Sequence, residues 1–341
     1  MDTICVMGAG SWGSALAILL NSNNHNVNLF MRNETQAEEI KKSKRNFKYL
    51  GDIEIPESIN IVTDIDNAVK DAKLIVIAVS SQATRQAMIS LKNKINSDVI
   101  IVNVSKGLEK GTNKRISEIA KEILPDNKFV VLSGPSHAEE VAVKMPTTVV
   151  AGSEDLNAAQ YVQDIFSNEY FRVYTNPDVI GVELGGSLKN IIAFGSGIID
   201  GLGYGDNTKA AIMTRGLAEI ARLGVELGAD ISTFAGLSGI GDLIVTCTSM
   251  HSRNRRAGIL IGQGKSLDET LKEIQMVVEG ITATEVAYNL SLEKGIDMPI
   301  TAEIYKVLYE GKDIKVTIKS LMMRNKKHET EDLIHLKYSD I

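Results

Sequence analysis

Cysteine is scarce in this chain, which has only two, Cys5 and Cys247. Cys5 lies in an apolar run that predicts a buried first strand, so a structural disulfide is not expected. No apolar run reaches the ~18 residues that a membrane-spanning helix needs, and the first residues show neither the basic segment nor the cleavage site of a secretory signal. We therefore expect a cytoplasmic protein without stable membrane insertion.

An excess of positive charge is also lacking, since Asp and Glu outnumber Lys and Arg and the net charge is −6. A nucleic-acid partner is not expected, because broad attraction to phosphates requires a basic surface. Any anionic ligand must instead meet a local group of cations. No spacing of His, Cys and Asp suggests a metal site. The share of hydrophobic residues, 44%, is typical of globular proteins and argues against disorder.

The length of 341 residues exceeds the ~250 to 300 residues at which single cores stop growing, so two domains are expected. The first half alternates short apolar runs with helical stretches, a pattern that predicts βαβ units and a mainly parallel sheet. The expected strands are 3–8, 27–32, 74–79, 99–104, 128–133, 147–152 and 171–175.

The second half replaces strands with stretches of helical spacing broken by Gly or Pro. The expected helices are 179–200, 207–227, 252–262, 266–273, 281–293 and 302–309. The predicted fold class is thus an α/β N-terminal Rossmann-type domain with a mainly parallel sheet, residues 1–180, plus an all-helical C-terminal domain, residues 181–341. The first would bind a dinucleotide and the second would carry the substrate and catalytic groups. We expect the highly charged end, 325–341, to be loosely ordered.

A glycine-rich motif, Gly8-Ala9-Gly10-Ser11-Trp12-Gly13, directly follows the first strand and opens an apolar helix. In this context Gly8 permits a tight turn, Gly10 lets a pyrophosphate approach the backbone, and Gly13 lets helix and strand pack closely. The helix start supplies N–H donors and a positive dipole end. The motif predicts dinucleotide binding, against the alternative of a strand-to-helix turn that is merely rich in glycine.

Cofactor choice depends on the end of the second strand, where enzymes that use NAD usually carry an acid. Here Arg32 stands at that point, and Glu34 lies two residues later. An arginine would pair with the 2′-phosphate of NADP. The sequence therefore favours NADP, with NAD as the alternative cofactor, and leaves open that Arg32 is a solvated loop cation.

The stretch 185–197 predicts an unusual helix, because each interior glycine costs ~1 kcal/mol relative to alanine. Helical spacing places Gly186, Lys189, Ala193 and Gly197 on one face, so the lysine lies where its neighbours are small. Desolvation or a nearby cation lowers the pKa of such a lysine into the range of a general base. The alternative is a lysine whose amine reaches solvent from a packed helix.

Three arginines, Arg253, Arg255 and Arg256, fall in the first turn of the helix expected after Thr248 or Ser249, either of which would cap it. The helix dipole disfavours cations there, so a bound phosphate would explain them. The alternative is that they pair with acids elsewhere.

Lys106 and Ser136 each follow the carboxyl end of a strand, the edge at which open α/β sheets bind ligands. Both are candidates to face the substrate, although ordinary turn chemistry is the alternative. His137 is a weaker candidate for acid–base chemistry, because a lone loop histidine has no supporting context.

Together these motifs resemble one family, the bacterial-type NAD(P)-dependent glycerol-3-phosphate dehydrogenases. The resemblance covers most of the chain and includes Trp12 inside the glycine-rich motif. Its other marks are the stretches 104–107, 132–136, 183–190, 241–243 and 252–254.

The resemblance implies that Lys189 is the proton acceptor. It implies a set of residues around glycerol 3-phosphate, namely Lys106, Gly134, Ser136, Lys189, Asp242, Ser252, Arg253 and Asn254. It implies a second set around the cofactor, namely Ser11, Trp12, Arg32, Lys106, Ala138, Arg253, Val277 and Glu279, beside Gly8, Gly10 and Gly13. A homodimer is expected on the same ground.

The expected function is the interconversion of sn-glycerol 3-phosphate and dihydroxyacetone phosphate, which supplies glycerol 3-phosphate for phospholipid synthesis. Besides the base Lys189, Lys106 would polarise the substrate carbonyl, and Asp242 would orient a lysine or a substrate hydroxyl. Two alternatives remain open at this point. One is another hydroxyacid-type dehydrogenase of the same architecture, and the other is a non-catalytic dinucleotide sensor.

Overall fold

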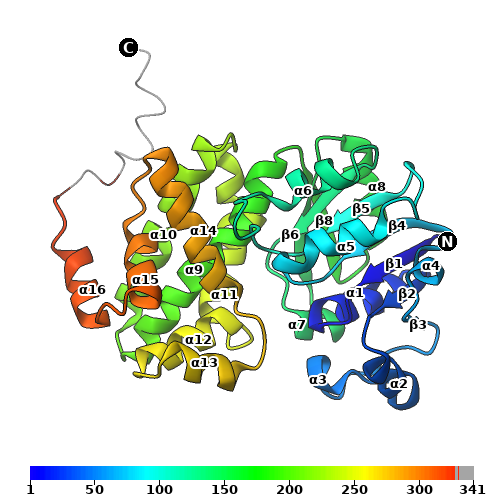
Figure 1. The fold of residues 1–341 in the computed structure, drawn as a ribbon, viewed down its shortest axis with the longest axis horizontal. Coiled ribbons are helices and arrows are strands. Elements are labelled where there is room, and N and C mark those ends of the chain that lie inside the picture. The colour runs from blue at the N-terminus through cyan, green and yellow to red at the C-terminus, as the bar shows by residue number, and fades with distance from the viewer. Residues whose placement is uncertain (327–328, 330–341) are drawn as a thin grey trace, which may run out of the picture. The chain divides into compact units, whose positions relative to one another are not determined.

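A computed structural model of the chain describes residues 1–326 and residue 329. The expectation for the charged end concerns mostly residues outside these ranges. The chain forms two compact units, unit 1 from Met1 to Glu183 and unit 2 from Leu184 to Ile341. Figure 1 draws the sheet of unit 1 and its helices in blue to green, and the helices of unit 2 in green to red.

Unit 1 contains an eight-stranded sheet in the order β3-β2-β1-β4-β5-β6-β7-β8. Neighbouring strands run parallel except for β6 and β7, which pair in antiparallel fashion. The strands are β1 (Thr3–Met7), β2 (Asn26–Phe30), β3 (Asn60–Val62), β4 (Ala72–Ile77), β5 (Ile100–Asn103), β6 (Phe129–Ser133), β7 (Thr147–Gly152) and β8 (Phe171–Asn176). The predicted fold class is confirmed.

The seven expected strands are present, with ends that differ from the prediction by no more than two residues. β3 was not expected, because three residues are too few for a hydrophobic period to be recognised. Strand β1 lies between β2 and β4, so the chain leaves β1 toward one side of the sheet and returns on the other. Such a reversal of strand order is where open α/β sheets bind ligands at their carboxyl edge.

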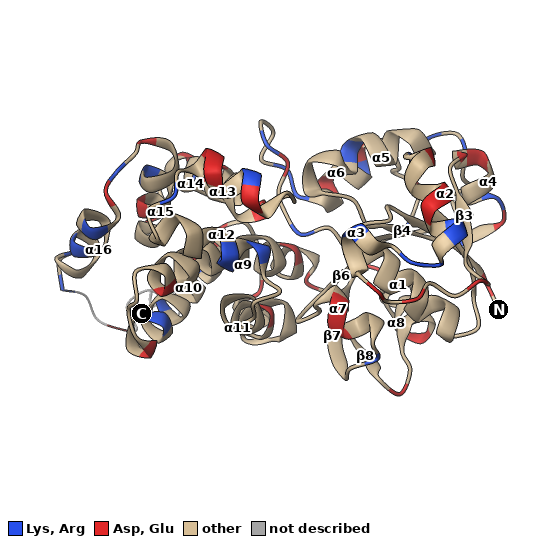
Figure 2. Ribbon diagram, turned by 90° about the horizontal axis from the view of Figure 1, so that it is seen from below, with Lys and Arg blue, Asp and Glu red and all other residues tan. Residues whose placement is uncertain are grey.

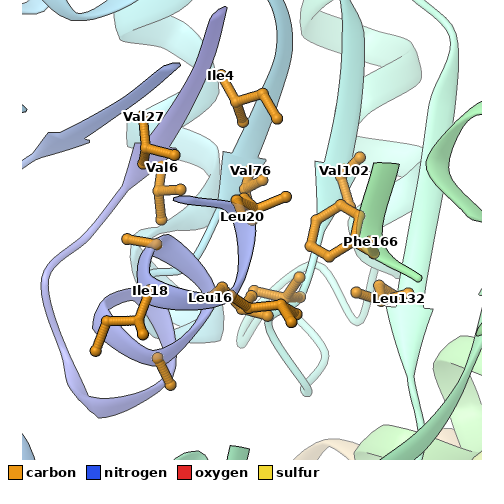
Figure 3. Close-up of a cluster of buried hydrophobic side chains, with 14 of the residues drawn as sticks. Ile4, Val6, Leu16, Ile18, Leu20, Val27, Val76, Val102, Leu132 and Phe166 are labelled. Atoms are coloured by element: carbon orange, nitrogen blue, oxygen red, sulfur yellow. The ribbon is translucent and has the colours of Figure 1, made fainter. Parts of the chain in front are cut away.

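Both faces of the sheet are covered, which explains strands that are apolar at every position. Along β1, Ile4 and Val6 join one buried cluster, whereas Cys5 and Met7 join the other. Figure 3 shows the first cluster, where side chains of β1 and β4 meet the long helix α1 and Phe166. The helices of this unit are α1 (Ser11–Ser22), α2 (Glu34–Ser43), α3 (Phe47–Leu50), α4 (Ile65–Val69), α5 (Thr84–Leu91), α6 (Ile116–Ile123), α7 (Ala138–Ala142) and α8 (Leu156–Phe166).

Unit 2 is helical. Its helices are α9 (Val179–Gly201), which begins in unit 1, α10 (Asp206–Glu226), α11 (Asp242–Thr248), α12 (Arg253–Gly262), α13 (Leu267–Ile274), α14 (Glu279–Lys294), α15 (Pro299–Tyr309) and α16 (Ile314–Met322). All six expected helices are present, whereas α11 and α16 were not expected. No helix among the described residues combines the length and the apolar character needed to cross a membrane.

The glycines of α9 accommodate other backbone segments of unit 2. A Cβ atom at Gly197 would lie 2.1 Å from the carbonyl oxygen of Arg255, in α12. A Cβ atom at Gly185 would lie 2.6 Å from the carbonyl oxygen of Ser238. Glycine at these positions therefore permits close packing of backbones.

Candidate functional site

The three glycines of the loop after β1 have distinct steric roles. Gly8 has a φ of +112°, and a Cβ atom there would lie 2.5 Å from the carbonyl oxygen of Ala78. A Cβ atom at Gly13 would lie 1.9 Å from the carbonyl oxygen of Gly8, so this glycine lets α1 pack against the turn. A Cβ atom at Gly10 would meet no described atom within 4 Å. The loop is thus tight at its ends and open at its centre, which fits the approach of a pyrophosphate.

Of the other residues expected at the cofactor, Ser11, Trp12 and Arg32 lie within the loop or directly after the neighbouring strand β2, whereas Arg253, Val277 and Glu279 lie in unit 2. Ser11 and Trp12 are the first two residues of α1, and the partly buried Trp12 side chain packs against the first hydrophobic cluster. Arg32 is exposed and stands two residues beyond the end of β2, the strand end on which the cofactor prediction depends. Asn33 then caps α2 by accepting a hydrogen bond from the Gln36 N–H at 3.0 Å.

Three residues expected at the substrate meet at the carboxyl edge of β5 and β6. The Lys106 amine donates a hydrogen bond to the Gly134 carbonyl at 2.9 Å, and the Ser136 hydroxyl donates to the same carbonyl at 2.9 Å. Gly134 has a φ of +138°, a conformation that favours glycine. Ala138 begins α7, directly after this turn. The structure therefore brings these side chains together around one main-chain oxygen.

Lys189 is buried in unit 2, with 7% of its side chain exposed. Its Nζ atom lies 2.5 Å from Oδ1 of Asp242 and 2.6 Å from Oγ1 of Thr246, both on α11. Thr246 in turn donates to the main-chain oxygen of Asp242 at 2.6 Å. Burial removes water, so these two oxygens fix the position of the amine. The alternative of a lysine that reaches solvent is excluded.

The pairing with Asp242, 1% exposed, changes the expected electrostatics of the lysine. A carboxylate at this distance favours an ammonium group, whereas the sequence emphasised an amine kept neutral by burial. Such a pair can hold a proton near an oxygen that becomes negative. The arrangement suits a proton donor in one direction of a reaction and an acceptor in the other.

A second polar network lies next to Lys189 in the chain. The Asn254 amide donates to Oδ1 of Asn190 at 2.8 Å and accepts from the N–H of Gly280 at 2.8 Å. The Arg253 guanidinium donates to the carbonyl of Val277 at 3.1 Å. These bonds bring together the starts of α12 and α14 and the middle of α9. The expected residues Val277 and Glu279 lie at the start of α14, beside the buried Gly280.

The three arginines of α12 do not share one role. Figure 2 marks basic residues along this helix. Arg255 pairs with Asp200 at 2.7 Å and donates to the carbonyl of Thr248, so it fastens α12 to α9 and α11. The helix is capped by Ser252, whose hydroxyl accepts from the N–H of Arg255, and not by Thr248 or Ser249. For Arg255 the structure therefore shows the alternative stated above, which is pairing with an acid.

Two polar residues of these networks, Asn190 and Thr246, were not singled out from the sequence. The four-residue spacing of Asp242 and Thr246 places both on one face of a helix and could have identified the threonine. Asn190 is adjacent to Lys189, but nothing local in the sequence indicates that its partner lies 64 residues away. Ser252, Asn254 and Asp242, which were singled out, are buried.

Family models match both parts of this chain. The model of the NAD-dependent glycerol-3-phosphate dehydrogenase N-terminus matches residues 3–159, and that of the C-terminus matches residues 178–319. The glycerol-3-phosphate dehydrogenase (NAD(P)+) of a Thermoanaerobacter species is 59% identical over 96% of this chain and 98% of the relative. The enzyme of that name from Clostridium perfringens is 53% identical over 96% of this chain and 99% of the relative.

A solved structure extends the similarity to the fold. Glycerol-3-phosphate dehydrogenase from Coxiella burnetii is 36% identical, has a TM-score of 0.91, and is matched over 95% of this chain and 99% of its own. The residues matched by the two family models include the glycine-rich loop and the helices that carry Lys189 and Asp242. The chain belongs to the family of NAD-dependent glycerol-3-phosphate dehydrogenases.

Proposed function

We propose that this chain is a glycerol-3-phosphate dehydrogenase that interconverts sn-glycerol 3-phosphate and dihydroxyacetone phosphate with NADP, or with NAD as the alternative cofactor. Its product would supply phospholipid synthesis. The observation that carries the proposal is the buried Lys189 amine held by Asp242 and Thr246 in a chain of this family. Such an amine is a proton-transfer group that a sensor does not need, which argues against the non-catalytic alternative.

The bound nicotinamide would supply or accept a hydride at C2 of the substrate. Lys189 acts at the oxygen on the same carbon. In reduction, its ammonium group donates a proton to the oxygen that becomes a hydroxyl; in oxidation, the amine takes that proton back. Asp242 balances the charge of the lysine, and Thr246 fixes its direction. Preorganised groups of this kind need little rearrangement during the reaction.

The start of α12 is the proposed site for the substrate phosphate. Arg253 supplies the cation there, and Ser252 and Asn254 supply polar groups. Arg255 is not assigned to this site, because it pairs with Asp200. Lys106 and Ser136, around the Gly134 carbonyl, would face the substrate from the edge of the sheet. A fixed phosphate holds the reacting carbon in place, which raises the rate by lowering the entropic cost of alignment.

Residues 1–180 would bind the dinucleotide through Gly8, Gly10, Gly13 and Arg32, and residues 181–341 would bind the substrate and carry out proton transfer. We propose a homodimer that acts in the cytoplasm.

A spectrophotometric assay tests this function. The purified chain should oxidise NADPH in the presence of dihydroxyacetone phosphate, and a parallel series with NADH measures the cofactor preference. Arg253→Ala should raise KM for dihydroxyacetone phosphate by about ten- to a hundredfold, since a charge-assisted bond is worth about 1.5 to 3 kcal/mol. Equal wild-type rates with dihydroxyacetone, which has no phosphate, would contradict the phosphate site. Turnover of a 2-oxo acid alone would indicate a hydroxyacid dehydrogenase, and no turnover would favour a sensor.

A further inference from the structure

Two side-chain amides outside the glycine-rich motif hold its main chain. The Asn46 Nδ2 group donates to the carbonyl of Ala9 at 2.9 Å and to the hydroxyl of Ser14 at 2.9 Å. The Gln36 Nε2 group donates to the same Ala9 carbonyl at 3.0 Å. Asn46 is 2% exposed and Ser14 is fully buried. The Ala9 carbonyl oxygen therefore accepts one hydrogen bond from Gln36, in α2, and one from Asn46, the residue before α3.

The direction of this carbonyl determines the direction of the next N–H group. In a trans peptide the C=O and N–H bonds point to opposite sides, so a fixed Ala9 carbonyl fixes the N–H of Gly10 on the other side. Gly10 is also the residue at which an added Cβ atom would meet no described atom within 4 Å. The hydrogen bonds to the Ala9 carbonyl therefore fix the orientation of the Ala9–Gly10 peptide, and they do so from the side opposite to the Gly10 N–H.

We propose that Gln36 and Asn46 are positioning residues for the dinucleotide, because they hold the Ala9–Gly10 peptide with its N–H directed at the pyrophosphate. The inference rests on the proposed cofactor site. The two amides are linked to each other, since Gln36 Nε2 lies 3.3 Å from Oδ1 of Asn46. They act before the cofactor arrives, and a preformed donor binds more tightly than one that must first be ordered.

Neutral substitutions separate this role from electrostatic effects on the phosphates. Gln36→Met keeps the length of the side chain and removes the donor, and Asn46→Ala removes both donated bonds. Gln36 lines a surface cavity of about 540 Å³ between α2 and α3, so its replacement leaves no buried void. The Gln36 variant therefore keeps the test valid if Asn46→Ala folds poorly.

Asn28→Ala is the matched control. Asn28 is also a buried amide of unit 1 whose Nδ2 group donates to a main-chain carbonyl, that of Ala68, at 2.9 Å. Its loss should lower stability in the same way without reaching the glycine-rich loop. A general effect of removing a hydrogen-bonded amide from unit 1 would appear in all three variants, whereas an effect on cofactor positioning would be absent from Asn28→Ala.

Nicotinamide fluorescence measures the Kd of each variant for NADPH. The kcat at saturating dinucleotide and the Tm are measured for the same variants. Gln36→Met and Asn46→Ala should each raise Kd about three- to tenfold, with kcat changed less than about twofold. Asn28→Ala should lower Tm and leave Kd within about twofold of wild type. Unchanged Kd in folded Gln36→Met, or an equal rise in Asn28→Ala, would overturn the inference alone. A wild-type chain that binds neither dinucleotide would overturn the cofactor site and this inference with it.

Discussion

The two units build their candidate sites in different ways. In unit 1 the loop after β1 works through its main chain, and its shape depends on glycines a few residues apart, such as Gly8 and Gly13. In unit 2 the polar groups are side chains far apart in sequence, as in the pair Lys189 and Asp242, which are 53 residues apart. A site built from main-chain groups is disturbed by a substitution that adds side-chain atoms. A site built from side chains is disturbed by a substitution that removes a hydrogen-bond or ion-pair partner.

Removal of the Lys189 amine should have the largest effect. Lys189→Met keeps the side chain nearly as long and removes the proton-transfer group, so kcat should fall about a thousandfold, within the usual range for general acid–base catalysis. The steady-state rate with dihydroxyacetone phosphate measures this. The control is Lys209→Met, which removes another partly buried lysine of unit 2, paired with Asp200 at 2.6 Å, and should keep kcat near wild type. A Lys189→Met enzyme that kept most of its turnover would refute the assignment.

Substitutions at two glycines of the glycine-rich loop should separate an effect on cofactor binding from an effect on stability. Gly13→Ala places a Cβ atom 1.9 Å from the Gly8 carbonyl oxygen, so it should cost about 1 to 3 kcal/mol of stability. Gly10→Ala meets no described protein atom, so Tm should change little while Kd for NADPH rises about tenfold or more. Calorimetric titration and thermal melts measure the two effects. If Gly10→Ala bound NADPH as tightly as wild type, the open side of the loop would not face the cofactor.

This difference explains what the sequence could predict. The glycine-rich loop was identified because its steric requirements lie within six residues, directly after a strand that was also identified. The strands of unit 1 could be predicted for the same reason, since burial on both faces makes every position apolar. Their antiparallel pair, β6 and β7, could not, because pairing direction is decided between segments distant in sequence.

In unit 2 the sequence could single out Lys189, but it could not predict why the neighbours of this lysine are small. Gly197, on the same helix face as Lys189, makes room for the main chain of α12, which is distant in sequence. Likewise, a first turn rich in arginine could not indicate which member pairs with Asp200; the structure assigns Arg255 to that acid. Thr246 was overlooked because its function depends on the amine that it meets across the unit.

Buried carboxylates extend the comparison of the two units. In unit 1, Glu183 is paired with Arg115 at 3.1 Å and accepts hydrogen bonds from Ser117. These partners lower the pKa of Glu183, but desolvation is the larger effect and raises it. In unit 2, Glu219 is 2% exposed and accepts the N–H groups of Ile300 and Thr301 at the start of α15. Burial raises the pKa of Glu219 from 4.5 to about 7, against the opposing effect of these hydrogen bonds.

The raised pKa of Glu219 predicts a pH-dependent contribution to stability. Between pH 4.5 and about 7 the folded chain keeps a proton that the unfolded chain releases, so this contribution is complete below pH 4.5 and is lost as the pH rises through 7. The difference in unfolding free energy between wild type and Glu219→Gln should therefore fall with pH by up to about 1 kcal/mol per unit in that window. Urea unfolding at several pH values measures it, with Glu226→Gln, an exposed position on the same helix, as the control. A difference that stayed constant across the window would show that the folded chain tolerates Glu219 as a carboxylate, held by the N–H groups of α15 alone.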